Sequence, residues 1–118
     1  MTRENKELLL QDICARLPYG VKVKTNNINI LKLGTHTRVG EYVTDVVEPC
    51  KPYLFPLSSM TEEQSMEFAL LQVNTHKDGF LYVCDCANMM KWLLKNHFDI
   101  YGLIPMGLAI DATGLNIY

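Results

Sequence analysis

Three prolines within eight residues, Pro49, Pro52 and Pro56, limit most strongly what this chain can fold into. Proline has a fixed φ and no backbone N–H, so it is excluded from helix interiors and occurs in sheets only at edges or bulges. Residues 48–57 therefore predict an extended, irregular segment rather than a helix or a central strand.

The apolar side chains of this segment still need burial. We expect Tyr53 and Leu54 to lie in the core, because the prolines reduce the freedom that the unfolded chain loses when an irregular path is ordered. In an extended chain Phe55 points to the side opposite Leu54. Phe55 is therefore a candidate for a surface that contacts a partner protein.

An amphipathic helix is predicted near the N-terminus. Apolar residues recur at i, i+3, i+4 and i+7 in Leu10, Ile13, Cys14 and Leu17, and so share one face. Pro18 ends the helix, because the residue before a proline is pushed out of the helical region.

Alternating residues then predict strands. Val21–Lys24 alternates valine with lysine, and the asparagines at 26–27 are typical of a two-residue turn. Val23 is then expected opposite Ile30, which puts the lysines on the other face. Residues 42–47 predict a third strand, completing an antiparallel meander.

Helices dominate the second half of the chain. Thr61 and Gln64 have the spacing of a capping box, which predicts a helix start. The side of this helix expected to be buried consists of Met66, Ala69, Leu70 and Val73. A second helix is predicted from about Asp85 to His97, with Trp92 off its apolar stripe, and a short strand or turn follows at 108–110.

Strands that cluster early and helices that cluster late are typical of the α+β class. A length of 118 residues corresponds to one domain, residues 1–118. We expect an N-terminal helix, an antiparallel three-stranded meander, two helices packed on one face of the sheet, and a short C-terminal strand or turn.

Charge is unevenly distributed. The net charge is -2, yet residues 13–40 carry five basic and no acidic side chains. This basic strip has three explanations: it attracts the acidic remainder within one fold, it is a solvated face, or it is a surface that binds nucleic acid or another polyanion. The candidate contacts of such a surface are Arg16, Tyr19, Lys22, Lys24 and Arg38.

The cysteines do not form a recognisable metal site. Zinc sites use paired C-x-x-C or C-x-x-H spacings, which are absent among Cys14, Cys50, Cys84 and Cys86. No nucleotide-binding loop and no carboxylate pair with acid–base spacing is present either. We expect no metal, no cofactor and no catalytic activity; a pocket with His36 or His76 beside a carboxylate would favour an enzyme.

Neither a membrane span nor a signal peptide is predicted. The apolar runs fall far short of the ~20 residues that cross a bilayer, and the N-terminal residues lead into no apolar core of a signal sequence. We therefore expect a cytoplasmic protein.

Residues 17–21, 50–63, 97–104 and 107–109 resemble a family of small uncharacterised proteins of gut Bacteroidetes genomes, often encoded among phage-derived or mobile-element genes. The chain departs from that family at Phe55, where relatives often carry arginine. The resemblance implies a phage or mobile-element context and no particular chemistry.

Two functions follow from these patterns. The first is a non-catalytic accessory protein that binds a partner protein, or a second copy of itself, through exposed apolar residues such as Phe55 and Trp92. The alternative is a nucleic-acid or polyanion-binding module that uses the basic strip at residues 16–38.

Overall fold

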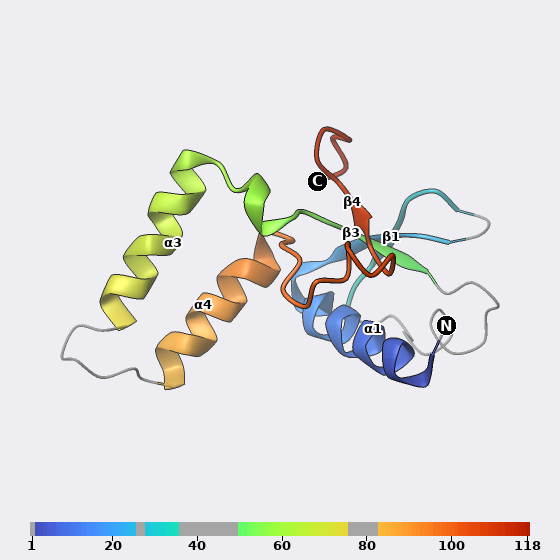
Figure 1. The fold of residues 1–118 in the computed structure, drawn as a ribbon, viewed down its shortest axis with the longest axis horizontal. Helices are drawn as coiled ribbons and strands as arrows, with labels where there is room; N and C mark the ends of the chain where they lie inside the picture. Colours follow the sequence, from blue (N-terminus) through green and yellow to red (C-terminus); the bar gives the residue numbers. More distant parts are fainter. Residues whose placement is uncertain (1, 26–27, 36–49, 76–82) are drawn as a thin grey trace.

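The protein has an α+β architecture with a four-stranded mixed sheet (Figure 1). The computed structural model describes residues 2–25, 28–35, 50–75 and 83–118, apart from the side chains of 72–75 and 83–86. In chain order the elements are helix α1 (Arg3–Arg16), the 3-10 turn η1 (Leu17–Tyr19), strands β1 (Val21–Lys24), β2 (Leu31–Leu33) and β3 (Lys51–Leu54), the 3-10 turn η2 (Leu57–Ser59), helices α3 (Glu62–Thr75) and α4 (Val83–Lys95), and strand β4 (Ile110–Asp111).

Helix α1 begins at Thr2, whose hydroxyl accepts a hydrogen bond from the backbone N–H of Asn5. Its buried residues are three, four and seven positions apart, and so lie on one side: Leu9, Asp12, Ile13 and Arg16. The predicted apolar side differs at Cys14, which is exposed. Two charged residues, Asp12 and Arg16, lie on the buried side of the helix instead.

The β1–β2 hairpin is one residue out of the predicted register. Val23 pairs with Leu31 rather than with Ile30. Because successive side chains alternate between the faces of a sheet, this slip buries Leu33 and leaves Ile30 52% exposed. The turn predicted at 26–27 lies outside the described residues.

The prediction that the prolines exclude a central strand is wrong. The strand order is β2-β1-β3-β4, with β3 antiparallel to β1 and parallel to β4. Strand β4 pairs with Tyr53 and Leu54 and does not extend to Pro52. At Pro52 this side of β3 is therefore an edge of the sheet, where proline is tolerated. The third strand predicted at 42–47 lies outside the described residues. The sheet is therefore mixed and four-stranded, rather than a three-stranded meander.

Core residues lie on both faces of the sheet. Helix α1 covers one face, in a cluster with Val21, Val23 and Leu54. On the other face Tyr53 packs with Ala112 and Ile117 of the C-terminal segment. Tyr53 is 6% and Leu54 0% exposed, which confirms the predicted burial of both.

Helices α3 and α4 pack on each other and project from the sheet, rather than covering its face as predicted (Figure 1). The predicted capping box is confirmed at the start of α3. The Gln64 side chain accepts a hydrogen bond from the N–H of Thr61 at 3.0 Å, and the Thr61 hydroxyl accepts one from the N–H of Gln64 at 3.1 Å.

The buried side predicted for α3 is exposed. Met66 and Leu70 are 69% and 64% exposed. Helix α4 packs instead on the opposite side of α3, where the ring of Phe68 stacks on Trp92. Helix α3 thus has two apolar sides, and α4 covers one of them.

Candidate functional site

Four lysines lie on the sheet face opposite α1. Lys22 pairs with Lys32 across β1 and β2, and Lys24 pairs with Lys51 across β1 and β3. Residues at paired positions project from the same face of a sheet. These four side chains, which we call the lysine face, therefore form one basic surface.

The lysine face is electrostatically unfavourable by itself. Like charges directly opposite on neighbouring strands destabilise a sheet. The ion pairs within the described ranges join Arg3 to Glu7 and Arg16 to Asp12, and neither includes a lysine. This arrangement favours an anionic ligand or partner on the face, because such a partner would offset the repulsion.

A pocket of about 260 Å³ adjoins the lysine face and is lined by Tyr19, Gly20, Lys22, Lys32, His97 and Tyr118. Gly20 has a φ of 77°, which glycine adopts without steric cost. A Cβ at this position would also lie 3.2 Å from the Cε atom of Lys32. Glycine therefore lets the stem of Lys32 lie close to the backbone at the pocket.

Tyr118 holds one wall of this pocket in place. Its hydroxyl accepts a hydrogen bond from the N–H of Lys22 at 2.8 Å and donates one to the carbonyl of Tyr53 at 2.9 Å. The Nζ atom of Lys22 donates to the carbonyl of Ile117. Burial raises the pKa of Tyr118 to about 12, so its hydroxyl stays protonated at neutral pH.

His97 ends helix α4 in the left-handed conformation, with a φ of 64°. Its N–H donates to the carbonyl of Leu94, and the N–H of Phe98 donates to that of Leu93, which is the Schellman pattern that usually places glycine at this position. The ring stacks on Tyr118, with centroids 3.5 Å apart.

The imidazole of His97 is neutral at pH 7. Burial, together with the positive charges of Arg16 and Lys22, lowers the pKa of His97 to about 4. Its Nδ1 atom is buried and has no hydrogen-bond partner within the part of the chain that the structure describes. A polar atom of this kind is normally satisfied by a protein group, a water or a ligand.

The structure brings together only part of the predicted basic strip. Tyr19 and Lys22 line the pocket, and Lys24 is exposed on the lysine face. Arg38 lies outside the described residues. Arg16 does not belong to this surface, because it is fully buried.

The prediction for Arg16 is wrong because a carboxylate lies one turn earlier on the same side of α1. Its Nε and Nη2 atoms donate to the two oxygens of Asp12 at 2.8 and 3.0 Å, and Nη2 also donates to the carbonyl of Phe98 at 2.6 Å. Burial raises the pKa of Asp12, while the hydrogen bonds from Arg16 oppose that rise. Arg16 therefore has a structural role.

Phe55 and Trp92, the residues predicted to contact a partner, are half-buried members of a row of aromatic rings. Trp92 stacks between Phe68 and Phe98 at centroid distances of 5.3 and 5.7 Å. Phe55 packs against Phe98 and Tyr118 at 6.4 and 6.0 Å. The row joins the two projecting helices to the sheet. A partner contact for either ring stays a prediction.

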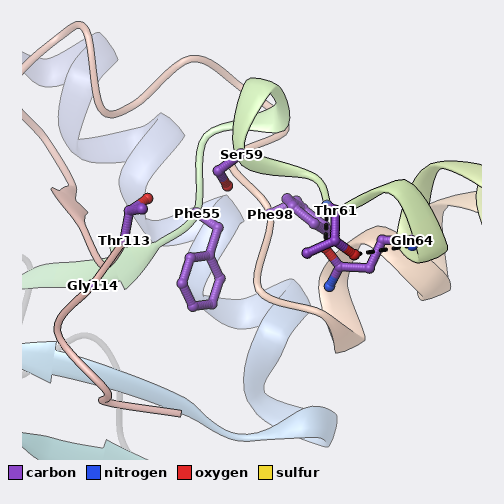
Figure 2. Close-up of a pocket in the computed structure, with 7 residues that line it drawn as sticks. All are labelled: Phe55, Ser59, Thr61, Gln64, Phe98, Thr113 and Gly114. Carbon is purple, nitrogen blue, oxygen red and sulfur yellow. Dashed lines mark hydrogen bonds between the residues drawn. The ribbon is translucent and has the colours of Figure 1, made fainter.

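Phe55 also lines a second pocket of about 260 Å³, and Figure 2 shows its ring between Thr113 and Phe98. Its lining carries no charged side chain within the part of the chain that the structure describes. Three of its polar side chains have partners within the fold: the Ser59 hydroxyl donates to a backbone carbonyl, and the side chains of Thr61 and Gln64 form the cap of α3. It is therefore a weaker candidate than the pocket at the lysine face.

Sequence reasoning missed four members of the site: Lys32, Lys51, His97 and Tyr118. Lys32 belongs to the basic strip, and the correct hairpin register would have placed it opposite Lys22. Lys51 lies in the segment whose prolines predict that it does not form a central strand. Nothing in the local sequence marks His97 or Tyr118, because tertiary packing alone brings them to the pocket.

Comparison with known proteins gives no match: no protein-family model, curated protein or solved structure is detectably similar to this chain. Within the described residues, no cluster of side chains is suited to hold a metal ion. No helix in the same ranges has both the length and the apolar character needed to cross a membrane.

Proposed function

We propose that this chain is a non-catalytic interaction protein, and that its lysine face docks an acidic amphipathic helix. The observation that carries the proposal is the two lysine–lysine pairs across β1, which have no acidic ion-pair partner among the described residues. Ile28 and Ile30, near the tip of the same hairpin, are 45% and 52% exposed. Apolar side chains beside the lysines suit a helix with both acidic and apolar residues better than a purely anionic ligand.

The chain itself contains such a helix. The side of α3 turned away from α4 presents Met66 and Leu70, and exposed Glu63 and Glu67 form the neighbouring row along the helix. We call these four residues the α3 stripe. Its apolar centre and acidic edge are complementary to the lysine face.

The occupant we propose is a second copy of this chain. Helix α3 and the strands of the β1–β2 hairpin lie toward opposite ends of a molecule 49 Å long (Figure 1). One chain therefore does not place its own α3 on its own lysine face. Two copies in an antiparallel, two-fold arrangement form both contacts at once, which closes the assembly as a dimer.

Nucleic acid is the second candidate, because paired lysines on a sheet also neutralise phosphates. Two features weigh against it. The burial of Arg16 removes one of the expected phosphate contacts, and the exposed Ile30 has no counterpart in phosphate recognition. The role as a phage or mobile-element accessory protein is likewise a proposal, supported by the sequence resemblance.

Sedimentation velocity at low and high salt tests the dimer. We expect the wild-type chain to dimerise at low salt and to dissociate as salt screens the contact. The double variants Met66→Ser/Leu70→Ser and Lys24→Glu/Lys51→Glu should each be monomeric. The matched control is Lys91→Glu/Lys95→Glu, which changes two exposed lysines of α4 and should still dimerise.

Two results would overturn the proposal. One is a wild-type chain that stays monomeric at low salt and high concentration. The other is a control that dissociates as fully as Lys24→Glu/Lys51→Glu. A monomer that binds duplex DNA at low salt, and loses binding in Lys24→Glu/Lys51→Glu, would replace the dimer with the nucleic-acid function.

A further inference from the structure

The pocket beside the lysine face shares two lysines with that face and adds residues that docking of α3 does not use. Lys22 and Lys32 both line it, from paired positions of neighbouring strands. None of the described residues that line it is acidic. Lys22 donates one hydrogen bond to the carbonyl of Ile117, and an ammonium group has three N–H donors. Donors therefore remain for a ligand.

His97 adds a second, independent observation. A left-handed residue other than glycine is strained, and backbone strain of this kind clusters at binding sites. Here the strained residue lines the pocket, and its buried Nδ1 atom has no hydrogen-bond partner among the described residues. The strained residue therefore lies in the wall of the pocket, where its imidazole can contact a ligand.

The size of the pocket limits the ligand. A volume of about 260 Å³ lies just below the ~300–1,000 Å³ of sites for drug-sized molecules. It is nevertheless several times the ~30 Å³ that one water occupies in the liquid. A single small anionic group with some of its hydration therefore fits in it.

We propose that this pocket binds a phosphate group, held by the ammonium groups of Lys22 and Lys32 and contacted by His97. Phosphate offers several acceptor oxygens to donors that converge from different elements, and lysine binds it as a point charge. The pocket shares Lys22 and Lys32 with the lysine face, whereas His97, Gly20 and Tyr19 have no part in docking α3. Phosphate binding is therefore measured also in a variant that cannot dimerise.

An NMR titration of amide shifts tests the pocket. The probes are inorganic phosphate and phenyl phosphate at neutral pH, with sodium chloride at matched ionic strength as the reference. We expect saturable shifts at Gly20 and Lys22. Lys32→Gln should weaken binding about tenfold or more, the loss expected for one hydrogen bond to a charged group. Equal affinity for both probes identifies free phosphate as sufficient, and tighter binding of phenyl phosphate identifies a phosphate monoester.

Two comparisons make the outcome decisive. Lys24→Gln removes an exposed lysine of the same face that does not line the pocket, and should change the affinity less than about twofold. His97→Asn keeps a residue that tolerates the left-handed conformation and should weaken phosphate binding. The titration is repeated in Met66→Ser/Leu70→Ser, so that failure of the dimer does not affect it. Shifts that do not saturate by about 10 mM phosphate, or equal losses in Lys32→Gln and Lys24→Gln, would overturn the proposal.

Discussion

Arg16 donates a hydrogen bond of 2.6 Å to the backbone carbonyl of Phe98, 82 positions later in the chain. The same guanidinium forms a bidentate ion pair with Asp12, and all of these groups are buried. Helix α1 is thereby tied to the segment that follows α4. That segment carries His97, one wall of the candidate pocket.

Removal of this arginine should strongly destabilise the fold. Arg16→Met leaves the carboxylate of Asp12 buried without its partner, which typically costs about 3–5 kcal/mol. The double variant Asp12→Leu/Arg16→Met removes both charges and should recover much of that loss. Urea unfolding followed by circular dichroism measures both. An Arg16→Met variant as stable as the wild-type chain would show that the ion pair does not support the fold.

The ring and the hydroxyl of Tyr53 make separate contributions to the stability of the fold. Its ring is buried, and its hydroxyl donates a 2.6 Å hydrogen bond to the carbonyl of Asn29. Tyr53→Ala should lower the free energy of unfolding by about 3–5 kcal/mol. Tyr53→Phe should lower it by only about 0.5–1.5 kcal/mol. Similar losses in the two variants would mean that the hydroxyl, rather than the ring, dominates.

His97 should make stability depend on pH. Its pKa in the folded chain is about 4, below the ordinary value of 6.5. Between these two values the unfolded chain binds a proton that the folded chain does not, so stability falls as pH falls from about 6.5 to about 4. The charged or titratable groups around the imidazole are Arg16 of α1, Lys22 of β1, Lys32 of β2 and Tyr118.

Thermal unfolding between pH 7 and pH 4.5 measures this dependence. His97→Asn should show a flatter decline than the wild-type chain, because the carboxylates that titrate at the lower end are common to both. Phosphate bound beside the imidazole should also raise the pKa of His97, since an anion favours the protonated ring. Parallel curves for the two proteins would contradict the assignment of His97.

Trp92 should connect the projecting helices to the sheet. Its ring stacks between Phe68 of α3 and Phe98. Trp92→Ala should lower the free energy of unfolding by at most about 3–5 kcal/mol, the cost for a fully buried ring. The partial exposure of Trp92 reduces this cost. Hydrogen exchange should show the amides of α4 opening before those of β1. A variant with unchanged exchange in α4 would indicate that Trp92 contributes little to this junction.

Local signals could be predicted from the sequence, and long-range pairing could not. The capping box of Thr61 and Gln64 is confirmed because both partners lie within one helical turn. The prolines predict that residues 48–57 form no central strand, because the sequence does not reveal that β4 ends before it reaches Pro52. The predicted register of the hairpin is wrong by one residue because the sequence offers two apolar pairs for the buried face, Ile28 with Ile30 and Leu31 with Leu33. The correct choice depends on the core beneath.

The basic character of the site could be predicted from the sequence, but the residues that form the site could not. The basic strip supplies three of the four lysines of the face. The position of Arg16 at a helix end beside other basic residues predicts a surface side chain, whereas in the fold it is buried in a pair with Asp12. In α3 the helical period finds an apolar side at Met66 and Leu70. It does not show that Phe68, on the other side, is the residue that α4 covers.

A charge exchange tests the central claim, the docking of the α3 stripe on the lysine face of a second copy, most directly. The measurement is the weight-average sedimentation coefficient at low salt for three variants: Lys24→Glu/Lys51→Glu, Glu63→Lys/Glu67→Lys, and the chain that carries all four changes. The account predicts that each double variant is monomeric. The quadruple variant should dimerise again, because opposite charges meet once more across both copies of the contact. A quadruple variant as monomeric as its parents, or double variants that still dimerise, would contradict the account.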